Sequence, residues 1–419
     1  MQAVVLAAGE STRFLPFRYF DHKSLVRILG KPIIVHTIES IKRSGITDVI
    51  IVISQKPGVR DLLGDGKKFG VKITYVIQKK PTGGGNGLLL AKKYIKGDFF
   101  LLNASHIDFG EFKNFMLGRK NNQDKAVLLA KKEKDLEKFG VLKVEKDRVV
   151  GVIEKPQKGK EPSDLRLIGI YLFSKDFLKT LTDTPDEHYR LENALSAFVK
   201  KEQVRFVKTE ISVPSLKYAW DLLEIKNYLF ENIKTFRGKN VSISKSAEII
   251  GKVAIGDNAV VMEGARIKGP CFIGENTMIG NNAILRGNVD VEESCVIGAN
   301  MELKNSLVMN NTKMHSGFIG DSIIGEDCRV GADFSTANVR LDRKSVKVVI
   351  KENEVDSGLK FLGTFVGRNS KIGIKVSTMP GIIIGQNAII GPSTVVLHNV
   401  SDNTKYFTKF KEVVIKNEQ

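Results

Sequence analysis

Apolar and polar positions follow different periods in the two parts of the chain. In residues 1–234 short β-branched runs alternate with stretches whose apolar residues recur at helical spacing, the pattern of βαβ units around a mostly parallel sheet. Strands are predicted at 3–9, 48–54, 71–77 and 98–103, and helices at 32–44 and 85–95. Later segments at 165–173, 190–201, 204–210 and 218–233 complete this part, which we call the head.

After a polar linker at 235–240, aliphatic residues recur every six positions. The first ladder is Ile255, Val261, Ile267, Ile273, Ile279, Leu285, Val291, Ile297, Leu303 and Met309. The second ladder is Val366, Ile372, Thr378, Ile384, Ile390 and Val396. A period of six suits a three-sided prism in which each flat face takes one short strand and the aliphatic side chain points inward. Residues 241–405 are therefore predicted to form a solenoid with hexapeptide repeats, and 406–419 a C-terminal cap.

Residues 331–362 interrupt the register between the two ladders. We expect a functional loop there, because long irregular insertions in a regular scaffold commonly carry binding residues. A tolerated insertion without function is the alternative.

Composition indicates a globular protein outside the membrane. The chain is 42% hydrophobic and 27% charged, and it has no apolar run near the ~18–20 residues that a membrane span requires. No secretory signal precedes the first strand, so we expect a cytoplasmic protein. The three cysteines Cys271, Cys295 and Cys328 lack CxxC spacing and lie among aliphatic repeat positions, which favours small buried residues over metal ligands.

The net charge of +18 is concentrated in the head. Residues 236–419 carry 23 Lys and Arg against 19 Asp and Glu, which leaves +14 for residues 1–235. A basic head attracts polyanions, but the chain has no Arg-rich run and no aromatic stacking motif typical of nucleic-acid binding. Small anions such as nucleotides and sugar phosphates are the favoured partners.

The head carries LAAGESTRFLP at 6–16, then Lys23, then LGKPI at 29–33. This resembles the signature of sugar-1-phosphate nucleotidylyltransferases, and later segments match in order, including QKKPTGGGNG at 78–87 and EKP at 154–156. The resemblance implies an α/β, Rossmann-like nucleotidyltransferase head in which Arg13 and Lys23 neutralise the triphosphate during attack by the sugar phosphate. It also implies two binding sets: Leu6, Ala7, Ala8, Gly9, Gln78 and Gly83 for the nucleotide, and Gly140, Glu154, Lys155 and Gly169 for the sugar phosphate.

Several positions depart from the resembled pattern. Ser105 and Ser215 stand where the family has the two aspartates that hold Mg²⁺, and Ser11 replaces the second signature glycine. Loss of both metal ligands should cost orders of magnitude in rate, so Mg²⁺ is expected only if the head is active. His22 and His106 are conceivable replacement ligands, but they form no spaced cluster.

The segment 314–342 resembles the acetyltransferase half of bifunctional glucosamine-1-phosphate acetyltransferase/N-acetylglucosamine-1-phosphate uridylyltransferases, particularly archaeal forms. The resemblance implies a left-handed parallel β-helix, homotrimers, acetyl-CoA as co-substrate, and His315 as catalytic base, a role suited to a side chain that exchanges protons near neutral pH. Asn338 matches a substrate-binding asparagine, and Phe318 replaces the family's tyrosine. The basic residues expected to contact acetyl-CoA and the amino sugar are Arg340, Lys344, Lys347 and Lys360. A solvated corner residue is the alternative for His315.

The sequence thus predicts acetyl-CoA-dependent N-acetylation of an amino-sugar 1-phosphate by the β-helix. The head would join UTP or dTTP to a sugar 1-phosphate, with release of pyrophosphate, unless the two serines have abolished this reaction. A regulatory or scaffold subunit that pairs with an active paralogue is the alternative function.

Overall fold

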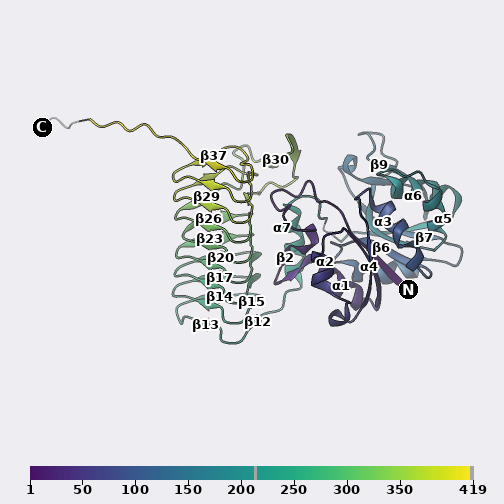
Figure 1. Cartoon of the computed structure of the whole chain (residues 1–419), viewed down its shortest axis with the longest axis horizontal. Helices are drawn as coiled ribbons and strands as arrows, with labels where there is room; N and C mark the ends of the chain where they lie inside the picture. The colour runs from purple at the N-terminus through teal and green to yellow at the C-terminus, as the bar shows by residue number, and fades with distance from the viewer. Residues whose placement is uncertain (212–214, 416–419) are drawn as a thin grey trace. The chain divides into compact units, whose positions relative to one another are not determined.

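A computed structural model describes residues 1–211 and 215–415 (Figure 1). It contains two compact units that do not coincide with single stretches of sequence. The first unit comprises Met1–Ser11, Phe20–Val26 and Lys31–Ser215, and the second comprises Thr12–Tyr19, Arg27–Gly30 and Leu216–Gln419. Two short segments of the loop after the first strand therefore group with the second unit. In the described residues no helix has both the length and the apolar character needed to cross a bilayer.

The first unit is built on a nine-stranded sheet in the order β5-β4-β1-β6-β10-β7-β11-β9-β8. Its strands are β1 (Gln2–Ala7), β4 (Asp48–Ile53), β5 (Lys72–Ile77), β6 (Phe99–Asn103), β7 (Ala126–Lys132), β8 (Gly140–Glu145), β9 (Arg148–Glu154), β10 (Leu165–Phe173) and β11 (Val204–Thr209). Its helices are α1 (Ile33–Arg43), α2 (Gly58–Leu63), α3 (Gly84–Ala91), α4 (Phe109–Arg119), α5 (Phe177–Asp183) and α6 (Arg190–Lys201).

Helices cover both faces of this sheet, as the buried β-branched strands require. One core cluster joins β1 and β4 to α1, α2 and α4, and the other joins the opposite strand faces to α3, α5 and α6. The central strand β1 is parallel to β4 and β6, whereas β10 runs antiparallel to β6. The predicted Rossmann-like α/β head is confirmed.

The second unit is a left-handed parallel β-helix with three flat faces. The first face is β12 (Phe236–Arg237), β15 (Val253–Ile255), β18 (Cys271–Ile273), β21 (Val289–Val291), β24 (Leu307–Val308), β27 (Ile323–Ile324), β32 (Phe365–Val366) and β35 (Ile383–Ile384). The second face is β13 (Ser242–Ile243), β16 (Val260–Val261), β19 (Met278–Ile279), β22 (Val296–Ile297), β25 (Lys313–Met314), β28 (Arg329–Val330), β33 (Lys371–Ile372), β36 (Ile389–Ile390) and β38 (Lys405–Tyr406). The third face is β14 (Glu248–Ile250), β17 (Arg266–Lys268), β20 (Ile284–Arg286), β23 (Met301–Lys304), β26 (Gly317–Gly320), β29 (Phe334–Thr336), β34 (Ser377–Thr378) and β37 (Val395–Val396).

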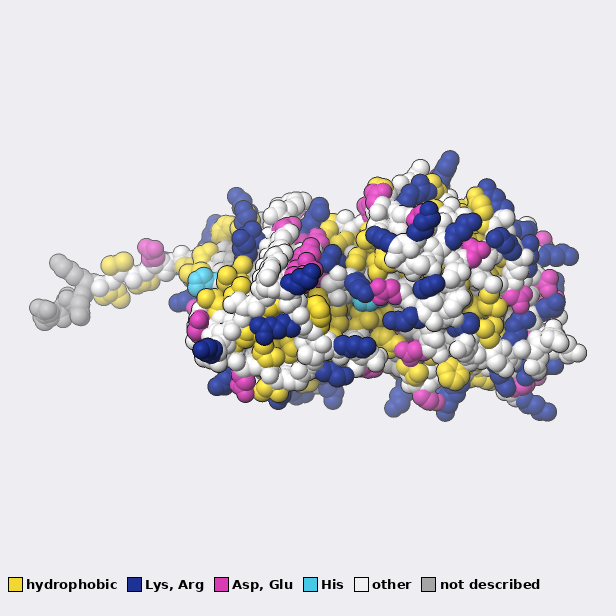
Figure 2. Space-filling model, turned by 90° about the horizontal axis from the view of Figure 1, so that it is seen from below, with side chains coloured by type: hydrophobic (Ala, Val, Ile, Leu, Met, Phe, Trp, Pro, Cys, Tyr) yellow, Lys and Arg dark blue, Asp and Glu magenta, His cyan; other side chains and the backbone are white. Residues whose placement is uncertain are grey.

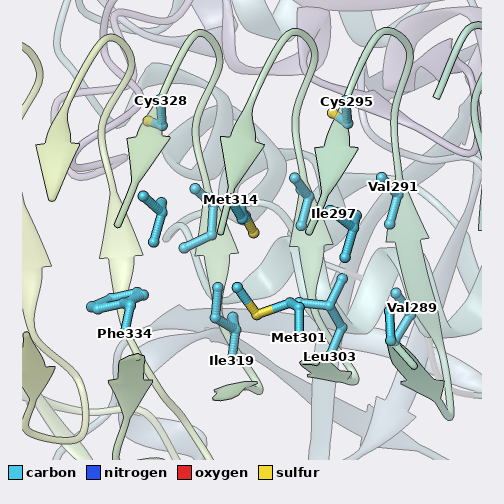
Figure 3. Packing of buried hydrophobic residues seen from close by; sticks show 14 of the residues in the cluster. Val289, Val291, Cys295, Ile297, Met301, Leu303, Met314, Ile319, Cys328 and Phe334 are labelled. Atoms are coloured by element: carbon cyan, nitrogen blue, oxygen red, sulfur yellow. The ribbon is translucent and has the colours of Figure 1, made fainter. Parts of the chain in front are cut away.

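The predicted aliphatic ladders fill the interior of the β-helix, with one correction. Every ladder residue from Ile255 to Leu303 is buried in one continuous core, but the last member of the first ladder is Val308 and not Met309. The reason is a shorter coil: Val253 pairs with Cys271, eighteen residues on, whereas Val291 pairs with Val308, seventeen residues on. The cysteines Cys295 and Cys328 point into the same interior (Figure 3), and burial raises the pKa of each thiol to about 12.

The segment that leaves the coils between the two ladders, which we call the excursion, starts later than the predicted residue 331. Phe334–Thr336 stays in the third face as β29 and pairs with β26 and β34, so the chain leaves the coil only after it. The excursion contains an antiparallel hairpin, β30 (Lys347–Ile350) and β31 (Asn353–Asp356), and an antiparallel bridge between Val339 and Phe361 closes its base. At the C-terminus, residues 407–415 follow β38 as an exposed segment without helix or strand.

The first face of the β-helix is covered, whereas the other two are open. Its outward side chains Asp290, Leu307, Ile323 and Phe365 are buried. They lie beneath α7 (Asp221–Glu231) and the segments Thr12–Tyr19 and Arg27–Gly30, all parts of the second unit. The ring of Trp220 packs 6.3 Å from that of Phe365, and the backbone N–H of Leu29 donates to Asp290 over 2.9 Å.

Candidate functional site

The loop after β1 begins beside the carboxyl end of β6, because Leu6 pairs with Asn103. Ala7 and Ala8 are buried, and the chain then turns through Gly9 and Ser11. Ser11 has a φ of 56°, in the left-handed region that the family's glycine adopts without strain. Its buried hydroxyl has no hydrogen-bond partner among the described residues. The replacement of glycine by serine therefore lowers the stability of this turn.

Lys23 and Arg13, the two predicted catalytic cations, lie in different units. Lys23 begins the short 3₁₀ helix η1 (Lys23–Leu25) in the first unit. Arg13 belongs to the second unit, where its exposed guanidinium lies 5.8 Å from the ring centre of Tyr218. His22 caps η1, because its Nδ1 accepts the backbone N–H of Ser24 at 3.2 Å. This use of the ring explains His22 as a capping residue rather than a metal ligand.

Gln78 supports the glycine loop that precedes α3. Its side-chain Nε2 donates to the carbonyl of Gly83 over 3.0 Å. Gly83 has a φ of 116°, and any side chain there would collide with the carbonyl of His188. Glycine is therefore required at position 83, and the loop is held in one conformation from both sides.

The predicted sugar-phosphate residues gather around the start of β10. Gly140 pairs with Glu154, and a Cβ at 140 would come within 2.9 Å of the Glu154 carboxylate. Lys155 has a φ of 48°, and its Nζ donates to the Tyr189 hydroxyl over 3.1 Å. Further along β10, a Cβ at Gly169 would lie 2.9 Å from the Asn103 amide nitrogen. Glycines thus let polar side chains approach the backbone at both places.

The residues after β6 do not fit the magnesium site that the resemblance implies. Ser105 is buried and Ser215 is exposed, and neither carries the charge that Mg²⁺ prefers. The carboxylate on this loop, Asp108, is 1% exposed, and the Nδ1 of His106 lies 3.4 Å from it. Within residues 1–211 and 215–415 no group of three His, Cys, Asp or Glu side chains could hold a metal ion.

His315 lies at the corner between the second and third faces of the β-helix. It follows β25, and its backbone N–H donates to the carbonyl of Val330 on the next coil over 2.9 Å. The side chain is exposed, and no described residue hydrogen bonds to the imidazole. The backbone is thus fixed while the ring is free to meet a substrate.

Asn338 lies at the other edge of the third face, after β29. At about 3.3 Å per residue, the strand β26 spans roughly 10 Å, and a Cβ on Gly320 would lie 2.7 Å from the Asn338 amide nitrogen. Within one chain, His315 and Asn338 therefore lie at opposite edges of the third face.

Phe318 lies between these two residues on the third face. A Cβ at Gly320 would come within 2.8 Å of the far end of the Phe318 ring, on the same side as the Asn338 amide. A tyrosine at 318 would bring its hydroxyl close to that amide. The replacement thus removes a hydrogen-bonding group beside Asn338.

The basic loop is only partly free to bind anions. Arg340 forms a bidentate ion pair with Asp342, with N–O distances of 2.9 and 2.7 Å, which lowers the pKa of the Asp342 carboxyl. Lys347 pairs with Glu354 across the hairpin at 2.9 Å. Lys344 and Lys360 are exposed and have no ion pair among the described residues. Figure 2 shows Lys and Arg side chains spread over the displayed face, interspersed with acidic ones.

Asp321, which no motif in the sequence marks, contacts Asn338. Its carboxylate accepts the Asn338 amide over 2.6 Å and is 3% exposed. No spacing rule marks this aspartate, because it is one of several acidic corner residues along the repeats.

Comparisons with known proteins agree with both units. Residues 2–221 match the family model described as nucleotidyl transferase, and residues 267–405 match the GMPPB C-terminal domain. The chain is 35% identical to the "Bifunctional protein GlmU" of Methanococcus vannielii over 99% of both chains. It is 34% identical to the protein of the same name from Methanocaldococcus jannaschii, covering 96% of this chain and 97% of the relative. It is 30% identical to the "Bifunctional sugar-1-phosphate nucleotidylyltransferase/acetyltransferase" of Sulfurisphaera tokodaii, covering 96% and 98%.

Proposed function

The chain belongs to the family of bifunctional sugar-1-phosphate nucleotidylyltransferase/acetyltransferases, and on this premise we propose that its β-helix transfers the acetyl group of acetyl-CoA to the amine of an amino-sugar 1-phosphate. The observation that carries the proposal is the exposed His315 on a fixed corner, at the opposite edge of one open face from Asn338.

In this reaction His315 accepts a proton from the amino group as the nitrogen attacks the thioester carbonyl. The new C–N bond forms, the C–S bond breaks, and coenzyme A leaves as a thiolate that takes up the proton. Lys344 and Lys360 are free to attract the phosphates of the sugar and of coenzyme A, and Arg340 and Lys347 contribute if their acidic partners release them.

We propose a homotrimer in which His315 of one copy faces Asn338 of the next. The separation of the two residues within one chain supports this arrangement. The covered first face leaves the second and third faces for assembly, and these carry exposed apolar side chains at Met278, Ile284, Ile389 and Val395.

For the head we propose binding of UTP or dTTP and a sugar 1-phosphate without efficient nucleotidyl transfer. Gln78, Gly83, Glu154 and Lys155 keep positions consistent with ligand binding, whereas Ser105 and Ser215 supply no charge for Mg²⁺.

The test measures free CoA thiol and pyrophosphate from the purified protein. We expect thiol release with acetyl-CoA and an amino-sugar 1-phosphate, a loss of about 10²–10⁴-fold in His315→Ala, and pyrophosphate release only in Ser105→Asp/Ser215→Asp. Thiol release that survives His315→Ala would refute the base. Absence of both products from the native protein would instead support a regulatory or scaffold subunit.

A further inference from the structure

One corner of the β-helix, between the third and first faces, carries a column of polar side chains. Asn305, Asp321 and Asn338 follow β23, β26 and β29 on three successive coils. The stacking of coils places these residues one above another, and Asp321 occupies the middle.

The Asp321 carboxylate uses both oxygens. Oδ1 accepts the side-chain amide of Asn305 over 2.7 Å, and Oδ2 accepts the amide of Asn338 over 2.6 Å. Oδ2 also accepts Lys304 Nζ over 3.0 Å. The carboxylate is therefore fully hydrogen-bonded, as a buried charge requires.

This arrangement fixes which way the Asn338 amide points. A carboxylate can only accept, so Asn338 must turn its NH₂ group toward Asp321, and its carbonyl oxygen then points away. That oxygen has no hydrogen-bond partner among the described residues. The Asn338 backbone is also held, because its carbonyl accepts the N–H of Leu362 over 2.8 Å.

The column is anchored at its other end by helix α7. The fully buried Nζ of Lys226 donates to the side-chain carbonyl of Asn305 over 3.0 Å and to the backbone carbonyl of Asn288. The chain Lys226–Asn305–Asp321–Asn338 is thus continuous, and each amide has only one orientation that satisfies its neighbours.

Side chains at a corner of this β-helix can stack on successive coils without a carboxylate among them. At another corner Asn240, Asn258 and Asn276 form a ladder of neutral amides, and Asn369, Asn387 and Asn403 form a second. Among the described residues, only the column that reaches Asn338 has a buried aspartate that bridges two side-chain amides, and the desolvation of this aspartate is costly.

We propose that Asp321 is a positioning residue, which orients Asn338 so that the amide carbonyl accepts a hydrogen bond from the amino sugar. The inference rests on the proposed acetyl transfer. By orienting Asn338, Asp321 favours a substrate that has an N–H or O–H donor opposite the amide carbonyl.

The test compares steady-state CoA release by the full-length wild type, Asp321→Asn, Asn338→Ala and the double variant. With an amide at 321 the Asn338 side chain can flip, so we expect KM for the amino-sugar 1-phosphate to rise about tenfold, the loss of one strong hydrogen bond. We expect kcat and its pH profile to stay unchanged because His315 is untouched. The double variant should match Asn338→Ala alone.

Asp257→Asn, the same change at a corner of an early coil, is the matched control and should keep the wild-type KM. Should Asp321→Asn fail to fold, Asn305→Ser supplies the test, with an expected rise of about threefold. An unchanged KM in Asp321→Asn, or additive effects in the double variant, would overturn the inference alone. A wild type that releases no CoA would instead overturn the proposed function, and the inference with it.

Discussion

His22 lies buried at the start of η1, where its ring accepts a backbone N–H. Burial, assisted by the charge of Lys23, lowers the pKa of His22 to about 3. An unfolded histidine titrates near 6.5, so between these values the unfolded chain binds a proton that the folded chain does not. His22 therefore does not reduce the free energy of unfolding above about pH 6.5. Below that pH its titration lowers the free energy of unfolding by about 1.4 kcal/mol per pH unit.

We expect His22→Asn to keep the cap and to remove this part of the pH dependence, since asparagine also accepts the backbone N–H but does not titrate. Urea unfolding at pH 7.5, 6.5 and 5.5 provides the measurement. Equal slopes for the two proteins would show that His22 is already charged in the folded state.

Phe318 gives a second prediction at the residue scale. Its ring ends beside Gly320, close to the Asn338 amide. Phe318→Tyr should place a hydroxyl there and lower KM for the amino-sugar 1-phosphate by about three- to tenfold, the value of one hydrogen bond. CoA release at varied sugar concentration measures this, with Phe115→Tyr, an exposed ring in the head, as control. A KM equal to that of the wild type would mean that the substrate does not reach this part of the third face.

At the scale of elements, α7 is attached to the β-helix through a buried charge. Burial lowers the pKa of the Lys226 ammonium, and burial likewise raises that of the neighbouring Asp290 carboxyl. Lys226→Met would remove a nearby charge that favours the ionised Asp290 carboxylate, and it would leave the carbonyls of Asn288 and Asn305 without their ammonium donor. We expect this variant to lose about 3 kcal/mol of stability, because one partner of a buried pair stays uncompensated.

Thermal and urea unfolding of the full-length chain test this attachment. The double variant Lys226→Met/Asp290→Leu should recover most of the loss, since apolar replacement of a whole buried pair is often neutral. A single variant as stable as the wild type would argue that water, and not Asp290, compensates Lys226.

The predicted elements show where a periodic pattern is sufficient and where it is not. A period of six identified one inward residue in each strand from Ile255 to Leu303, because each coil repeats the same environment. It failed at Met309, where the coil is shorter and two adjacent apolar residues, Val308 and Met309, both fit the pattern. The same region contains Asn305, so the corner column could not be predicted from hexapeptide spacing.

At the scale of the whole molecule, sequence motifs located the two folds but not the grouping of their segments. The signature at 6–16 reads as one motif, yet its second half, Thr12–Tyr19, groups with the β-helix unit. Contacts such as that between Leu29 and Asp290 join residues 261 positions apart, and no local sequence pattern predicts them. A motif marks His315 as a candidate from the sequence alone, whereas Asp321 becomes a candidate only through its contact with Asn338 on the next coil.

The proposed trimer can be tested by mixing two variants of the chain and measuring whether they complement each other. If each acetylation site combines His315 of one copy with Asn338 of the next, His315→Ala chains alone should lack the base, and Asn338→Ala chains alone should keep only the low rate set by their raised KM. A mixture should complement when the amino-sugar 1-phosphate is kept well below that KM. Random reassembly of an equal mixture gives one intact site in each mixed trimer, so about one quarter of the wild-type rate should return. CoA release after unfolding and joint refolding measures this.

A mixture of His315→Ala with the double variant His315→Ala/Asn338→Ala is the control, because no arrangement of those chains contains an intact histidine. A rate in the test mixture no higher than the sum of this control and the Asn338→Ala share alone would show that no site combines the two residues across copies. Since β26 separates the two residues within one chain, the acetyl-transfer geometry would then have to be rebuilt around His315 or Asn338 alone.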